Sequence, residues 1–231
     1  MKHRYFQYRG NMAIYYLLVA ISKLYSLLFF GLDHIIIITP YGKLLVPKKG
    51  YASGARPITM ALDVVEPQWK PYFETMIKDA DWFLDIGAAS DGYYTLKAVR
   101  LNPKIKVIAI EPLKKEYYYL FNNLILNNIY RNVKSLNVAL CREEKETEIE
   151  GEKVRCVTLK DLGELKGRGV IKLDVEGAAY DILHNFLDYI CNLKPVIFLE
   201  IHNEQEVKLL FMLKSCGYKD IKKSGGMHIL I

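Results

Sequence analysis

The chain has 231 residues, enough for one α/β domain with a short N-terminal appendage but short for two full domains. Hydrophobic residues make up 51% and charged residues 25%, which excludes wholesale disorder and a protein with many membrane spans. The net charge is +6, and the whole excess of basic residues falls within residues 1–50. A basic surface for nucleic acid or anionic lipid is therefore expected at the N-terminus.

Residues 12–32 form an apolar segment, MAIYYLLVAISKLYSLLFFGL. As a helix it would be about 31 Å long, enough to span a bilayer. Lys23 lies at its middle, and a central lysine costs about 3 kcal/mol in a membrane. We expect a helix that packs on the domain or lies on a membrane surface, with a membrane span as the alternative.

The rest of the N-terminal region, residues 1–80, has weaker patterns. Residues 34–39 and 43–46 flank a proline-glycine turn and predict a β-hairpin. The segment 47–80 is rich in proline and glycine and predicts a connection with one helix near its end.

From Asp81 to the end, residues 81–231, apolar runs alternate with helical patterns and predict a parallel sheet covered by helices. The expected strands are 81–87, 106–112, 133–140, 170–177 and 195–202. The expected helices are 112–128, with Pro112 in the first helical position, 178–190, and 203–216, with Asn203 and Glu206 as a capping box. Residues 218–224 and 227–231 flank two glycines and predict a terminal hairpin.

The four cysteines are at least fifteen residues apart and form no C-x-x-C pair. This spacing indicates neither a zinc motif nor a disulfide-dense scaffold. We expect buried, reduced cysteines in a cytoplasmic protein, and a Cys191–Cys216 bridge stays open.

Candidate ligand-binding residues follow the strands, because parallel α/β sheets bind ligands beyond the carboxyl ends of their strands. In 85-DIGAASDGYYT-95, Asp85 ends a strand, and the small residues Gly87, Ala88 and Gly92 let the backbone approach a ligand. Neither a G-x-G-x-x-G fingerprint nor a P-loop lysine is present, which disfavours NAD and ATP.

Glu111 ends the next strand, where an acid binds the two hydroxyls of a ribose. The alternative is that Glu111 caps the following helix. Together with Asp85, this acid indicates a nucleoside ligand without a diphosphate, a description that S-adenosylmethionine fits.

Two further pairs lie at later strand ends: Asp174 with Glu176, and Glu200 with His202. A histidine at this edge has the right chemistry to deprotonate a hydroxyl group near neutral pH. For each pair a purely structural role is the alternative. An oxygen-rich metal site would require the fold to bring all four together, and we expect no metal.

These motifs resemble the FkbM-type family of class I S-adenosylmethionine-dependent methyltransferases. The resemblance covers about residues 80–205 and rests on 83-FLDIGAASDGYYTL-96, 108-IAIEPLKKEYYYLFNNLILNN-128, 137-NVALC-141, 156-CVTLKDL-162, 171-IKLDVEGAAYDIL-183 and 198-FLEIH-202. It implies a Rossmann-like α/β fold with a seven-stranded, mostly parallel sheet whose last strand is antiparallel. It also implies O-methylation of hydroxyl groups, often on sugars or secondary metabolites.

The resemblance assigns Asp85 and Gly87 to the turn around the cofactor's methionine part, and Glu111 to its ribose, and we count Ala88 and Gly92 of the same loop as cofactor-binding residues. It further assigns Asn137 and Val138 to the adenine of the cofactor. Asp174, Glu176, Glu200 and His202 would face the transferred methyl group and the acceptor, and we assign Asp174 to cofactor binding as well. The chain departs from the family in two places: four residues separate Gly87 from Gly92 where three are usual, and Ala179 replaces a common acid.

We therefore predict a methyltransferase that uses S-adenosyl-L-methionine, with His202 as the first candidate for the base, Asp174 as the second, and Glu176 beside them. The expected acceptor is a small molecule or glycan. One alternative is an RNA methyltransferase that contacts phosphates through Lys2, Arg4, Arg9, Lys43, Lys48 and Lys49. Another is a non-catalytic module that binds the cofactor or a partner, with peripheral membrane contact through residues 12–32.

Overall fold

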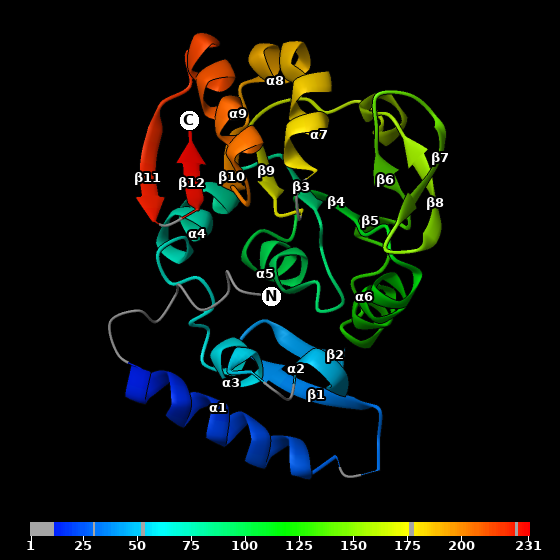
Figure 1. Ribbon diagram of the computed structural model, residues 1–231, viewed down its shortest axis with the longest axis vertical. Helices are drawn as coiled ribbons and strands as arrows, with labels where there is room; N and C mark the ends of the chain where they lie inside the picture. Colours follow the sequence, from blue (N-terminus) through cyan, green and yellow to red (C-terminus); the bar gives the residue numbers. More distant parts are fainter. Residues whose placement is uncertain (1–11, 30, 52–53, 176–177, 225) are drawn as a thin grey trace.

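The computed structural model describes residues 12–29, 31–51, 54–175, 178–224 and 226–231, and its centre is a seven-stranded sheet (Figure 1). The strand order is β11-β12-β10-β9-β3-β4-β5. The five strands from β10 to β5 are mutually parallel, and β12 is antiparallel to β10 and β11. The predicted α/β fold with an antiparallel last strand is confirmed. The bounds are β3 (Trp82–Ile86), β4 (Lys106–Ile110), β5 (Val133–Leu136), β9 (Gly169–Leu173), β10 (Val196–Glu200), β11 (Asp220–Ser224) and β12 (Met227–Leu230).

Helices cover both faces of this sheet, because successive strand residues point to opposite sides. On β3, Phe83 packs in one core cluster with side chains of α4 (Lys70–Lys78), α5 (Tyr93–Leu101) and α6 (Lys114–Leu126). Its neighbours Leu84 and Ile86 pack in a second cluster with α7 (Ala179–Asn185), α8 (Leu187–Leu193) and α9 (Glu204–Ser215). Apolar side chains on both faces explain the continuous hydrophobic runs of these strands.

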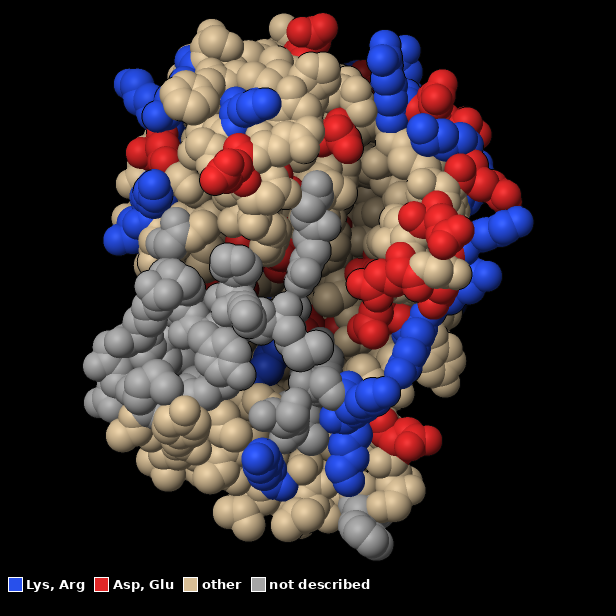
Figure 2. All heavy atoms as spheres, in the orientation of Figure 1, with Lys and Arg blue, Asp and Glu red and all other residues tan. Residues whose placement is uncertain are grey.

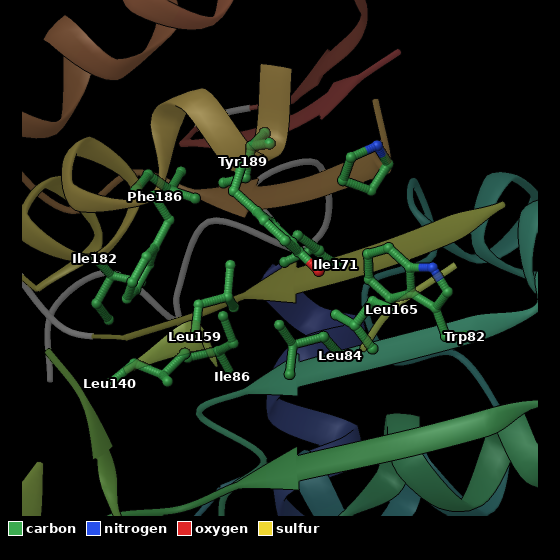
Figure 3. A pocket seen from close by; sticks show the side chains of 13 residues that line it. Trp82, Leu84, Ile86, Leu140, Leu159, Leu165, Ile171, Ile182, Phe186 and Tyr189 are labelled. Atoms are coloured by element: carbon green, nitrogen blue, oxygen red, sulfur yellow. The ribbon is translucent and has the colours of Figure 1, made fainter. Parts of the chain in front are cut away.

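The second core contains a small cavity of about 10 Å³ beneath the sheet (Figure 3). Leu84, Ile86 and Ile171 line it from the strands, and Ile182 and Phe186 from the helical side. Because the lining is mainly aliphatic and aromatic, this cavity offers few groups for catalysis or for holding water.

The N-terminal elements lie against the α5 and α6 side of the sheet (Figure 1). They are α1 (Met12–Leu27), the hairpin of β1 (His34–Thr39) and β2 (Gly42–Pro47), then α2 (Lys48–Tyr51), α3 (Arg56–Ala61) and α4. The predicted hairpin is confirmed, whereas the segment expected to carry one helix carries three. Among the described residues, no helix combines the length and apolarity that crossing a membrane demands.

The structure corrects three details of the predicted helices. Pro112 precedes α6, whose N-cap is Leu113. The expected helix over 178–190 is two helices that meet at Phe186. The Asn203 side chain caps α9 by accepting from the Glu206 N–H, but the Glu206 carboxylate bonds elsewhere, so the capping box is only half formed.

A three-stranded sheet between β5 and β9 was not predicted. It consists of β6 (Ala139–Leu140), β8 (Glu152–Val157) and β7 (Lys145–Ile149), followed by a 3₁₀ turn at Leu159–Leu162. The charged, largely exposed sequence of β7 gives little apolar alternation, which is the signal by which a half-buried strand is recognised.

The expectation of four reduced cysteines is wrong. Cys141 is bonded to Cys156, and Cys191 to Cys216. The first bridge links β8 to the residue after β6, and the second links α8 to the C-cap of α9. Cysteines fifteen and twenty-five positions apart in sequence meet because the intervening chain folds back, which spacing alone does not reveal. The reasoning that led from free thiols to a reducing compartment therefore no longer applies.

Candidate functional site

The candidate residues meet at the carboxyl edge of the three central strands, β3, β9 and β10. Asp85 on β3 is in register with Lys172 on β9, and Lys172 is in register with Phe198 on β10. Asp174 follows β9, and Glu200 ends β10. The fold therefore brings together residues that are more than a hundred positions apart in sequence.

Lys172 is a cation buried among carboxylates. Its Nζ lies 3.3 Å from Oδ2 of Asp174 and 5.2 Å from the centre of the Tyr94 ring. Burial alone would lower the pKa of Lys172, but the negative charges of Asp174, Asp85, Glu66 and Glu200 outweigh it and raise this pKa. The lysine therefore stays charged and holds the cluster together electrostatically.

Asp174 also faces His202, which lies just beyond β10. The distance from Oδ1 of Asp174 to Nε2 of His202 is 3.4 Å. Burial raises the pKa of Asp174, yet Lys172 and His202 more than offset this, and the pKa falls below its usual value. The neighbouring carboxylate of Asp174 raises the pKa of His202 against the opposing effect of burial.

Glu200 completes the group at this edge. Burial, reinforced by the charge of Asp174, raises the pKa of Glu200 to about 7. One ligand atom from each of Asp174, Glu200 and His202 lies within 4.8 Å of the others, a spacing from which a divalent metal ion could be held. The ammonium group of Lys172 already supplies positive charge at the same carboxylate.

The loop after β3 passes very close to the chain after β9. Gly87 has φ +79°, and a Cβ atom there would lie 2.2 Å from the carbonyl oxygen of Asp174. The N–H groups of Gly87 and Ala88 both donate to the carbonyl of Ile110, at 3.0 Å each. Gly92, with φ +57°, is the N-cap of α5. The loop is thus packed against the Asp174 backbone at a distance that requires glycine.

Asp85 is buried beneath this loop. Its Oδ2 accepts a hydrogen bond of 2.7 Å from Thr95, whereas Oδ1 is buried without a hydrogen-bond partner. Burial raises the pKa of Asp85 despite the charge of Lys172. An orphaned buried acceptor is costly, and a donor from a bound ligand would satisfy it.

Glu111 joins the same loop to the start of α6. Its Oε2 accepts from the N–H of Ala89 and its Oε1 from the N–H of Leu113, both at 3.0 Å. Burial raises the pKa of Glu111 to about 7 although both bonds lower it. Glu111 thus caps the start of α6, which was the alternative interpretation of this residue. Each of its oxygens still keeps a second lone pair for a ligand hydroxyl.

Asn137 and Val138 lie after β5, beside Glu111. Nδ2 of Asn137 donates to the carbonyls of Glu111 and Pro112, at 2.9 and 2.8 Å, and so fixes the turn after β4. Val138 is buried in the second core. Their predicted contact with an adenine stays a prediction.

Glu176 lies outside the described residues. Ala179 begins α7 fully buried, and its N–H donates to Glu206 at 3.1 Å. The other Glu206 oxygen accepts from the N–H of His202 at 2.7 Å. Glu206 therefore ties the loop that carries His202 to the start of α7.

Sequence reasoning missed three contributors to this site. Lys172 could have been found from the sequence, because a lysine inside an apolar strand is buried only when anionic groups lie beside it. Arg56 and Glu66 come from the N-terminal region, where no sequence pattern indicates a role in the site. Arg56 donates to Asp91 of the glycine loop at 2.8 and 3.0 Å. Glu66, buried and with φ +46°, accepts from the hydroxyl of Tyr94.

Residues 85–219 match the model of the methyltransferase FkbM domain. Among solved structures, a methyltransferase FkbM from Methylobacillus flagellatus KT is 14% identical with a TM-score of 0.51, and the match covers 66% of this chain and 43% of that one. The N-terminal domain of human METTL16 in complex with SAH is 14% identical with a TM-score of 0.51, covering 99% and 96%. A putative rRNA-methylase from Clostridium thermocellum is 12% identical with a TM-score of 0.50, covering 71% and 92%. A comparison with curated proteins finds no match.

Proposed function

The chain belongs to the FkbM methyltransferase family, and from this premise we propose that it transfers a methyl group from S-adenosyl-L-methionine to a hydroxyl group of a sugar, glycolipid or small metabolite. The observation that carries the proposal is the Asp174–His202 pair, placed against a loop whose Gly87 touches the backbone of Asp174. The proposed base and the proposed cofactor loop therefore lie at neighbouring strand ends of one sheet edge.

The residues around the loop fit the proposed cofactor. S-adenosyl-L-methionine, a sulfonium compound, supplies an activated methyl group. The orphaned Oδ1 of Asp85 is an acceptor for the ammonium group of its methionine part. Glu111 keeps lone pairs for the ribose hydroxyls, and Gly87 and Ala88 add no bulky side chain to the loop.

His202 is the base in this proposal. Methyl transfer is an in-line displacement, so the site must align donor and acceptor and exclude water. An alcohol is a weak nucleophile and gains from losing its proton as it attacks. With Nε2 of His202 directed at Asp174, Nδ1 is the nitrogen that takes the proton, and Asp174 stabilises the resulting cation.

Titration calorimetry with S-adenosylmethionine and S-adenosylhomocysteine tests the cofactor assignment. We expect micromolar binding that is lost in Glu111→Ala and weakened at least about tenfold in Asp85→Asn, which removes the charge that faces the ligand's ammonium group. Glu148→Gln, an exposed carboxylate on β7, is the matched control and should bind as the parent does. Failure of the folded parent to bind either compound would refute the assignment.

Transfer of a labelled methyl group to fractionated cell extracts tests the acceptor. Label in the glycan, glycolipid or small-metabolite fraction supports the proposal. Label confined to RNA supports the RNA-methyltransferase alternative instead. Cofactor binding without transfer to any fraction supports a non-catalytic module.

A further inference from the structure

Helix α1 carries an apolar stripe on its outer face. Leu17, Ile21, Leu24 and Leu28, the last just past the helix end, follow one another at intervals of four, three and four residues, which places them on one side. Their exposed fractions are 60%, 38%, 66% and 78%. We call these four residues the α1 stripe.

The opposite face of α1, which packs on the protein, combines polar residues with half-buried apolar ones such as Leu18. Ser22 and Ser26 are buried, and the Tyr25 hydroxyl donates to the carbonyl of Ile36 on β1. A surface helix of a soluble domain normally buries leucine and exposes serine. The exposure of four large aliphatic side chains on a helix that buries two serines indicates that the stripe has an apolar partner of its own.

A basic groove lies at the C-terminal end of α1. It has a volume of about 530 Å³, and its charged lining consists of Lys48, Lys49, Lys115 and the single acid Asp33. Leu32, which is 47% exposed, also lines it, so apolar and basic surfaces adjoin. Figure 2 shows a mostly tan lower edge, where Figure 1 places α1, and blue side chains near α2. We call this the lysine groove.

We propose that the α1 stripe and the lysine groove together dock the protein on the surface of an anionic lipid bilayer. The stripe inserts at the boundary between headgroups and acyl chains, and the lysines contact lipid phosphates. Charge decides between a bilayer and a second copy of this chain. Anionic lipid headgroups complement the lysines beside the stripe, whereas the same face of a second copy presents lysines again.

This inference does not rest on the proposed function, because vesicle binding is measured without cofactor or acceptor. The full chain is mixed with vesicles of phosphatidylcholine alone, or with about a quarter of phosphatidylglycerol, and bound protein is separated by flotation. We expect binding to the anionic vesicles that falls several-fold at about 0.5 M NaCl, and much weaker binding to phosphatidylcholine.

Paired variants separate the two parts of the surface. Leu24→Ser with Leu28→Ser should weaken binding at least about tenfold, since both changes remove apolar area that the bilayer would bury. Lys49→Gln with Lys115→Gln should weaken binding to anionic vesicles and reduce its dependence on salt. Phe211→Ser on α9, and Lys104→Gln with Lys208→Gln, change exposed residues outside the surface and should bind as the parent does. Unchanged melting temperatures show that each variant is folded.

Three results would overturn the proposal. The first is equal binding to both kinds of vesicle, or binding that the leucine changes leave intact. The second is a dimer in sedimentation equilibrium without lipid that the leucine changes dissociate, which would assign the stripe to a second copy. The third is calorimetric binding of inorganic phosphate at the groove that displaces the vesicles, which would assign the groove to a soluble anion.

Discussion

The imidazole of His202 and the carboxylate of Asp174 face each other across neighbouring strand ends, with Nε2 3.4 Å from Oδ1. The second oxygen of Asp174 faces Nζ of Lys172 at 3.3 Å. One carboxylate thus lies beside a histidine that can exchange its proton and beside a lysine that holds its own. This division of roles gives the site a titration behaviour that can be measured.

The first prediction concerns the pH dependence of methyl transfer. Because Asp174 raises the pKa of His202, the histidine becomes a free base only above its usual range, and the rate should rise with pH through that raised value. Asp174→Asn removes the charge that holds the proton, so the midpoint should move to lower pH and the maximal rate should fall by about 10²-fold or more. Single-turnover rates between pH 5 and 9 measure both effects.

The chain contains a matched control for this experiment. His228 and Asp220 form a second pair, with Nδ1 2.7 Å from Oδ2, on β12 and β11. Asp220→Asn should leave the midpoint of the rate profile in place. A midpoint that stays unmoved in Asp174→Asn would contradict the assignment of His202 as the base.

The second prediction concerns Lys172. Lys172→Met leaves Asp174, Asp85 and Glu200 without their buried cation and should lower the free energy of unfolding by about 3–5 kcal/mol at pH 8. Lysine is charged in both the folded and the unfolded chain between pH 5 and 8, so its own protonation adds no pH dependence there. The carboxyl groups have raised pKa values in the folded variant, so the deficit should grow as pH rises and shrink towards pH 5. Urea unfolding at several pH values tests this.

Lys97→Met provides the comparison for Lys172. Lys97 is equally buried, with Nζ 3.1 Å from Asp63 and 2.9 Å from Glu74, but it belongs to the N-terminal side of the fold. The Lys97→Met variant should also be less stable than the parent, but its cofactor affinity should stay within about threefold of the parent's. Equal cofactor affinity in both folded variants would show that Lys172 has only a structural role.

The third prediction isolates the close approach at Gly87. Gly87→Ala pays for a positive φ and must also displace the carbonyl of Asp174, which lies 2.2 Å from the position of the new Cβ atom. Gly151→Ala has nearly the same φ, +81°, in open space, so it should cost only about 1–2 kcal/mol. The excess loss of stability in Gly87→Ala measures the contact. Calorimetry should find cofactor binding abolished in this variant alone.

The fourth prediction concerns metal ions. Asp174, Glu200 and His202 are spaced so that they could hold a cation, but the ammonium group of Lys172 repels one from the shared carboxylate. Exhaustive chelation should therefore leave methyl transfer within about twofold of the untreated enzyme. If activity vanished on chelation and returned with Mg²⁺ or Mn²⁺, we would conclude that a metal ion activates the acceptor and that His202 is not the base.

The strands of the main sheet could be predicted because they are buried on both faces, and their sequences are therefore almost continuously apolar. Asp85 and Glu111 were found for the same reason, since an acid near the end of a buried strand or directly after it interrupts a strong apolar pattern. The bonds that Glu111 makes to Ala89 and Leu113 were beyond prediction because they depend on the loop conformation. The Cys141–Cys156 bridge and β7 required knowledge of how 139–157 folds back on itself.

The N-terminal contribution to the site was hidden for a different reason. Arg56 and Glu66 lie in a stretch with little periodicity, and each acts through a partner that follows it by about thirty residues, Asp91 and Tyr94 respectively. Their positions are set by packing of whole elements, which no local pattern encodes. The same holds for α1, whose apolarity was evident while the side that faces outward was not.

Helix α4 and the residue before it pack directly on β10. The rings of Trp69 and Phe73 lie 5.5 and 5.6 Å from that of Phe198, two residues before Glu200. Exchanging this N-terminal segment for a relative's would therefore repack the strand that carries the acid. The geometry at Glu200 therefore depends on core packing contributed from outside residues 85–219, the part that matches the family model.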